Sequence, residues 1–171
     1  MSDTNHAFID CQNLNLSTTR SSDSWKIDMK RFRVYLKDKY RVSNAYCFLG
    51  AYMPNLQDMY TAFQKYGYIL IFREHGYDLI GSKKGNVDTD IVFHVMRELI
   101  EDSALGKIVI VSGDGDYKRM IDYLIDKNRF AKILLPNKDN ASSLYKSIAD
   151  EYRAFLDTPA MRLKVGYKTK K

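Results

Sequence analysis

The chain has 171 residues, 45% of them apolar, which fits one folded domain and excludes a disordered chain. Its longest apolar runs are only as long as β-strands, so we expect no membrane-spanning helix, and its first residues lack the basic and apolar regions of a secretory signal. The formal net charge is +6, and five of these charges lie in residues 162–171, which contain no acid. We therefore expect a domain over residues 1–158 and a basic tail over residues 159–171. Such a tail suits an anionic partner, above all nucleic acid, and a solvated, disordered terminus is the alternative.

The sequence contains two cysteines, Cys11 and Cys47. Two are too few for a disulfide framework or for a cluster of metal ligands. We therefore expect both to be reduced thiols in a cytoplasmic protein.

Five short apolar runs each have the length of a buried strand. In chain order they are Ala7–Ile9, Ala45–Leu49, Ile69–Phe72, Ile108–Val111 and Ile133–Leu135. Helix-length segments lie between and after them: Asp28–Tyr40, Asn55–Tyr66, Asp88–Asp102, Asp116–Asn128 and about Ser142–Phe155. This alternation predicts an α/β fold with a parallel sheet covered by helices on both faces. Right-handed crossovers then place the carboxyl ends of all strands at one edge, where such sheets bind ligands.

Acidic residues follow two of the predicted strands. Asp10 ends the first strand, and Asn13 can turn its amide toward the same place, although an Asx turn would also explain this pair. Asp114 and Asp116 follow the fourth strand, and the glycines beside them permit a sharp turn. Capping of the next helix would explain Asp116. It explains Asp114 less well, because a second carboxylate adds repulsion unless a cation neutralises it.

Asp88 and Asp90 open the third predicted helix. At about 100° per residue they point to different sides of that helix. Asp88 borders the apolar stripe that we expect to be buried, whereas Asp90 joins a polar row. We therefore prefer Asp88 as a ligand and keep Asp90 as a supporting candidate. Attraction to the positive end of the helix dipole is the structural alternative for both.

Three separated segments thus bring acids to one edge of the predicted sheet. Oxygen-only ligands suit Mg²⁺ or Mn²⁺. One or two such ions could activate a water and stabilise the leaving oxygen of a phosphodiester. The candidate catalytic and metal-binding residues are Asp10, Asp88, Asp114 and Asp116. The three histidines show no ligand spacing.

The chain resembles the NYN domain family of PIN-like ribonucleases. The matching pieces are Phe8–Leu14, Lys84–Asp88, Val111–Tyr117 and Ala149–Tyr152, within a resemblance that spans about residues 6 to 157. The resemblance implies a three-layer, Rossmann-like PIN fold with five parallel strands in the order 3-2-1-4-5. It also implies Mg²⁺ or Mn²⁺ and endonucleolytic cleavage of RNA.

Carried over residue by residue, the resemblance assigns the metal-binding roles to the same four acids. Asn13 and Ser112 would support them. Three positions depart from the family pattern: Cys11 stands where relatives often have Gly, Gly115 where many have Ser, and His94 where the helix is often acidic. None of these changes removes one of the four acids.

The sequence therefore predicts a metal-dependent endoribonuclease that hydrolyses single-stranded RNA with a metal-activated water. Lys83, Lys84 and Arg73 are expected to contact the RNA backbone. A homodimer is compatible with the family, and no membrane partner is expected. Two alternatives remain open: a non-catalytic RNA-binding or regulatory adaptor that keeps the fold, and a phosphatase that acts on small phosphate esters.

Overall fold

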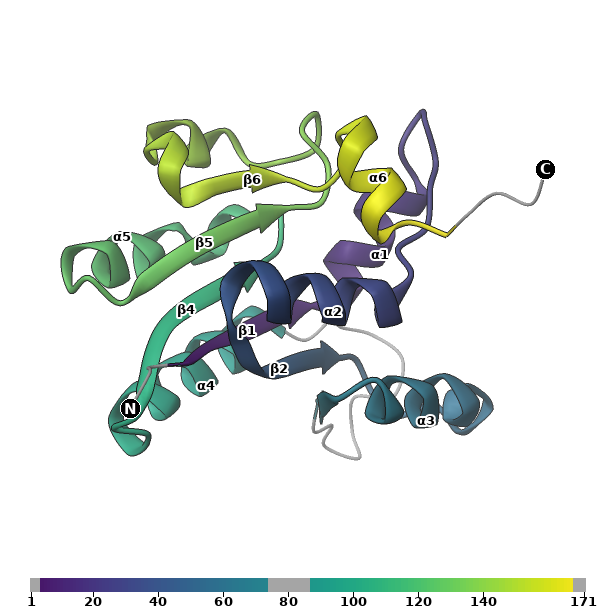
Figure 1. Cartoon of the computed structure of the whole chain (residues 1–171), viewed down its shortest axis with the longest axis horizontal. Coiled ribbons are helices and arrows are strands. Elements are labelled where there is room, and N and C mark those ends of the chain that lie inside the picture. The colour runs from purple at the N-terminus through teal and green to yellow at the C-terminus, as the bar shows by residue number, and fades with distance from the viewer. Residues whose placement is uncertain (1–3, 74–86, 168–171) are drawn as a thin grey trace, which may run out of the picture.

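Parallel strands in the order β3-β2-β1-β4-β5-β6 form the sheet at the centre of the protein (Figure 1). The computed structural model describes residues 4–73 and 87–167. The strands are β1 (Thr4–Asp10), β2 (Val42–Leu49), β3 (Tyr68–Phe72), β4 (Leu105–Val111), β5 (Phe130–Leu135) and β6 (Arg153–Phe155). The predicted α/β class and the order 3-2-1-4-5 are confirmed, and β6 extends the predicted five-stranded sheet beside β5.

Helices cover both faces of this sheet, as predicted. They are α1 (Cys11–Thr19), α2 (Met29–Tyr40), α3 (Gln57–Lys65), α4 (Val87–Glu101), α5 (Lys118–Asp126) and α6 (Pro159–Val165). Short 3-10 turns are η1 (Pro54–Leu56), η3 (Gly115–Tyr117), η4 (Ser143–Ser147) and η5 (Asp150–Tyr152). Helices α1, α2 and α6 pack on one face, and α4 and α5 pack on the other, which gives three layers (Figure 1).

The central strand β1 is buried on both sides, as expected in the middle of a parallel sheet. Ala7, Phe8 and Ile9 have no exposed surface. Phe8 belongs to the core cluster that contains Ile91 of α4, whereas Ala7 and Ile9 belong to the cluster that contains Phe32 of α2. Because side chains alternate between the two faces of a strand, one short apolar run fixes β1 between both helical layers.

Helix α1 occupies a segment for which we predicted no helix. Its sequence is rich in Asn, Ser and Thr, and only Leu14 and Thr18 are buried. The helix begins at Asp10, whose carboxylate accepts a hydrogen bond from the Asn13 N–H at 2.9 Å. The Thr18 hydroxyl donates to the Leu14 carbonyl at 3.0 Å, which satisfies its buried polar atom. Local capping, more than an apolar stripe, therefore defines this helix.

The helix predicted over about Ser142–Phe155 is wrong. The segment forms η4 and η5 and then β6, which pairs with β5 so that Arg153 lies opposite Ile133. Tyr145 and Ile148 are buried at a spacing that also suits a helix. Pairing with the edge of β5 satisfies backbone groups on both strands, and a helix would leave that edge open.

The predicted tail begins with helix α6, which packs against α2. Val165 is fully buried. Arg31 of α2 donates to the carbonyls of Leu163 and Gly166, at 2.8 and 2.6 Å, and so satisfies the carboxyl end of α6. Residues 159–167 are therefore folded on the face of the sheet that α2 covers. The domain boundary expected before them stays a prediction.

Cys11 and Cys47 form a disulfide bond, which corrects the expectation of two reduced thiols. Cys11 is the first residue of α1, and Cys47 is a fully buried residue of β2. Pairing of β1 with β2 places Ile9 opposite Cys47, which brings the two cysteines together. Disulfides are uncommon in the reducing cytosol, and the cytoplasmic location stays a prediction.

Candidate metal centre

The ends of two strands and the start of one helix meet at the carboxyl edge of the sheet. Asp10 is the last residue of β1, and Asp114 follows β4, which pairs directly with β1. Asp88 lies in the first turn of α4. This edge is where a parallel α/β sheet normally binds its ligand.

Asp88, Asp114 and Asp116 form a cluster in which one oxygen of each carboxylate lies within 4.8 Å of the others. Asp10 joins this acid cluster through Tyr117. The Tyr117 hydroxyl lies 3.3 Å from Oδ2 of Asp10 and also within hydrogen-bonding distance of Oδ1 of Asp88. Because a phenol has one proton, it donates to one of these carboxylates at a time. The structure therefore brings all four predicted acids together and adds a bridging tyrosine that sequence reasoning missed.

The electrostatics of the acid cluster are those of crowded carboxylates. Burial raises the pKa of the Asp10 and Asp88 carboxyls, and the charges of neighbouring aspartates raise both further. Burial and the adjacent acids also raise the pKa of the Tyr117 hydroxyl, which therefore stays protonated as a donor. In residues 4–73 and 87–167, no Lys, Arg or His forms an ion pair with any of the four acids.

Asn13 and Ser112 hold the backbone beside the acids. Oδ1 of Asn13 accepts a hydrogen bond from the Gly113 N–H at 2.8 Å and so connects α1 to the turn after β4. The buried Ser112 hydroxyl accepts a hydrogen bond from the Asp114 N–H at 3.1 Å. Both side chains use their oxygens to fix the turn that carries the acids.

The capping role falls on Asp114, whereas the sequence argument gave it to Asp116. Asp114 is the N-cap of η3, and its Oδ1 accepts a hydrogen bond from the Asp116 N–H at 3.1 Å. Asp116 is exposed. Within the described residues, the acid cluster includes Asp88 and does not include Asp90.

A cavity of about 460 Å³ opens beside the acid cluster. Asn140 and Ser142, which follow β5 and which sequence reasoning missed, line its other side. The Ser142 N–H donates to the Gly113 carbonyl at 2.9 Å, so this segment is fastened to the acidic turn. A Cβ atom on Gly115 would lie 2.5 Å from the Ser142 Oγ, so Ser142 fills the space that a side chain at position 115 would need.

Residues expected to contact RNA are only partly described. Lys83 and Lys84 lie outside the described residues. Arg73 follows β3 at the edge of the sheet, and β2 separates β3 from β1. Its N–H donates to the Gly50 carbonyl at 3.3 Å. Arg73 therefore lies two strands away from Asp10.

A second group of possible ligands lies at the other end of α4. Nδ1 of His6 is 3.4 Å from Glu98, and Nε2 is 3.7 Å from Asp102. His6 is buried. Each ring nitrogen thus lies near a different carboxylate, and Nδ1 makes no hydrogen bond among the described residues.

In metal-free protein, Asp88→Asn is expected to raise the free energy of unfolding more at pH 7.5 than at pH 4. The folded pKa of Asp88 is raised above its ordinary value of 3.8. Its contribution to stability is therefore complete below that ordinary value and is lost as the pH rises through the folded pKa. Urea unfolding in chelator across this pH range measures the effect. Asp90→Asn, on the same helix, is the control, and an equal pH-dependent gain in both variants would contradict the assignment.

Within the described ranges, no helix is long and apolar enough to cross a membrane. The NYN domain family model matches residues 7–156, a span that includes all four acids. No curated protein matches the chain. A crystal structure of a protein of unknown function from Vibrio parahaemolyticus has a similar fold, with a TM-score of 0.75 and 16% sequence identity over 98% of this chain and 99% of that chain. The match to the family model shows that this chain belongs to the NYN domain family and has the PIN-like nuclease fold of that family.

Proposed function

We propose that this protein is a divalent-metal-dependent endoribonuclease that hydrolyses phosphodiester bonds of single-stranded RNA. The observation that carries the proposal is the acid cluster, with Asp10 beside it and no cationic partner among the described residues. Carboxylates at this spacing repel one another unless a cation lies between them. Membership of the NYN domain family supports RNA as the substrate class.

The donor set fits Mg²⁺ or Mn²⁺, which prefer carboxylate oxygens. The donor atoms all lie within 4.8 Å of one another, so one ion can contact all three carboxylates after small side-chain movements. Asp88, Asp114 and Asp116 would hold the ion, with Asp10 beside them. Such an ion, when bound, makes water a stronger nucleophile and stabilises charge on the phosphate oxygens.

The residues of the chain would position the site and its substrate. The Asn13 N–H holds one oxygen of Asp10, and Tyr117 faces the other. Asn13 and Ser112 together fix the turn that carries Asp114. The cavity between this turn and Ser142 would admit the RNA backbone next to the carboxylates.

The proposal is tested by incubating the protein with an unstructured RNA in Mg²⁺ or Mn²⁺ and in excess chelator. We expect internal cleavage with either ion and none in chelator, because without the ion nothing activates the water or stabilises charge on the phosphate oxygens. The product ends distinguish the mechanism. Attack by water on phosphorus leaves no 2′,3′-cyclic phosphate, whereas attack by the 2′-hydroxyl leaves one and would identify a contaminating ribonuclease.

Two outcomes would contradict the proposal. RNA binding without metal-dependent cleavage would favour the non-catalytic adaptor. Intact RNA together with hydrolysis of a generic phosphomonoester would favour the phosphatase.

A further inference from the structure

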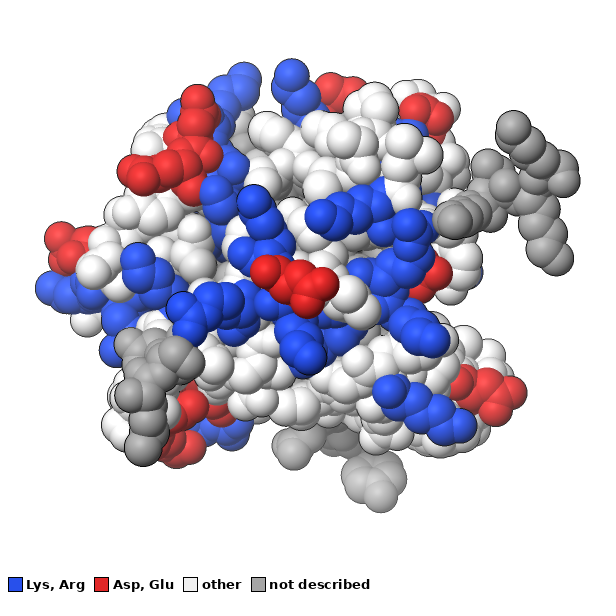
Figure 2. Space-filling model, in the orientation of Figure 1, with Lys and Arg blue, Asp and Glu red and all other residues white. Residues whose placement is uncertain are grey.

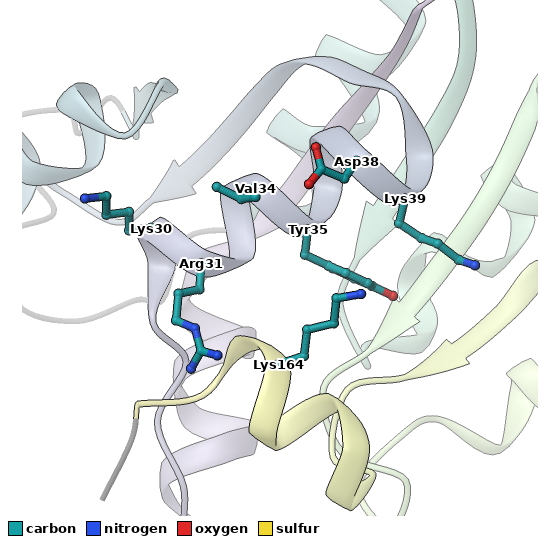
Figure 3. A pocket seen from close by; sticks show the side chains of 7 residues that line it. All are labelled: Lys30, Arg31, Val34, Tyr35, Asp38, Lys39 and Lys164. Atoms are coloured by element: carbon teal, nitrogen blue, oxygen red, sulfur yellow. The ribbon is translucent and has the colours of Figure 1, made fainter. Parts of the chain in front are cut away.

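A groove between α2 and α6 is the second notable surface of the molecule. It has a volume of about 620 Å³ and lies away from the acid cluster. Lys30, Arg31, Lys39 and Lys164 line it, against a single acid, Asp38 (Figure 3). A groove with this excess of positive charge attracts an anion.

The groove lies within a broader basic surface. Figure 2 shows Lys and Arg side chains gathered in a band across the face that α2 covers. Helix α2 alone carries five Lys or Arg residues and one acid. Among the described residues, Lys30, Lys39 and Lys164 form no ion pair. Burial and the charge of Lys39 lower the pKa of Lys132 on β5, so like charges lie close together on this face.

The walls of the groove are held in place by contacts across it. Nζ of Lys164 lies 5.3 Å from the centre of the Tyr35 ring, and Figure 3 shows it reaching from α6 toward α2. Arg31 points toward the end of α6, where it donates to two carbonyls. Lysines of α2 and α6 therefore line the same groove, and the contacts of Arg31 hold the two helices together.

We propose that the groove between α2 and α6 binds the phosphate backbone of the RNA substrate at a distance from the acid cluster. This inference rests on the proposed function. Lysines bind phosphates as point charges, without reading bases, so the contact would be independent of sequence. An acidic protein partner fits less well, because Tyr35 is only 7% exposed and offers no aromatic anchor for a protein interface.

The two RNA-binding regions would engage different parts of one strand. Helices α2 and α6 cover the face of the sheet opposite α4, which carries Asp88. A strand that occupies both regions must therefore pass around the sheet edge. A dinucleotide is too short to do so and would occupy the acid cluster alone.

The test is the double variant Lys39→Gln/Lys164→Gln, compared with the control Lys65→Gln/Lys127→Gln, which removes the same charge elsewhere. Binding of a long unstructured RNA is measured by fluorescence anisotropy in chelator over a range of salt. For single strands, each lost phosphate contact reduces the slope of log affinity against log salt by about 0.7. Relative to 1 M salt, where the contact contributes nothing, its loss therefore weakens binding about fivefold at 0.1 M salt. The groove variant should thus bind about 25-fold more weakly at 0.1 M salt and show a slope smaller by about 1.4.

Cleavage assays add a second readout. The groove variant should show a raised KM for the long RNA and an unchanged rate on a dinucleotide. Unchanged RNA affinity and salt slope, or equal losses in the control, would overturn the groove. Because binding is measured without metal, weakened binding in a protein that does not cleave would support the groove and reject the nuclease. If the enzyme cleaves RNA but its groove variant binds RNA normally, the nuclease is supported and the groove is rejected.

Discussion

Replacing Asp114 by asparagine is expected to lower the rate of metal-dependent RNA cleavage by at least about 100-fold while the fold survives. Asp114 is one of the three clustered carboxylates and follows the strand next to β1. A metal site supplies several kcal/mol of transition-state stabilisation, and each 1.36 kcal/mol corresponds to about tenfold in rate. Asparagine keeps the oxygen that accepts the Asp116 N–H at 3.1 Å, so the turn should persist without the charge.

The charge-matched control is Asp126→Asn on α5, where the acid pairs with Lys127 on the surface. It removes the same single charge from a position outside the acid cluster. Cleavage rates in Mn²⁺ are compared after circular dichroism and urea unfolding establish that both variants are folded. Full activity in Asp114→Asn, or an equal loss in Asp126→Asn, would refute the assignment of Asp114 to the metal centre.

Reduction of the disulfide is expected to lower the free energy of unfolding by about 4 kcal/mol. The cysteines are 36 residues apart, and opening a loop of this length restores that much conformational freedom to the unfolded chain in the loop-entropy description. Urea unfolding of the wild-type protein with and without reductant measures the loss. The variant Cys11→Ala/Cys47→Ala is the control, because its midpoint should not respond to reductant. A wild-type midpoint that is equally insensitive would show that the bond does not constrain the chain.

The parallel sheet and the gathering of acids at one of its edges could be predicted from strong local signals, whereas the strand order was implied by the resemblance to the NYN domain family. Continuous apolar runs indicate buried parallel strands, and topology alone then fixes which edge carries Asp10 and Asp114. Helix α1 could not be predicted in this way, because its start depends on the Asp10 cap and its sequence has no apolar stripe. The helix expected near Tyr145 failed for a different reason. Tyr145 and Ile148 are buried at a spacing that suits a helix, but the chain after them forms a strand because it pairs with the edge of β5.

Two residues that complete the site were missed for different reasons. Tyr117 follows the acids directly, yet its position among apolar core residues resembles ordinary packing until its hydroxyl is placed between Asp10 and Asp88. Its place immediately after the acidic turn was the available signal. Ser142 carried none, since only the folded chain brings the segment after β5 against Gly113.

The close approach of Gly115 and Ser142 has a consequence for evolution within the family. A side chain at position 115 would begin 2.5 Å from the Ser142 Oγ, so the two sites share space that holds one hydroxyl-bearing side chain. A side chain at position 115 should therefore be disfavoured while Ser142 is present, and a serine at position 142 should be disfavoured where position 115 already carries a side chain. Homologues with serine at the position of Gly115 are therefore expected to carry a smaller residue at the position of Ser142, so that the hydroxyl near the acids persists while its place in the sequence changes.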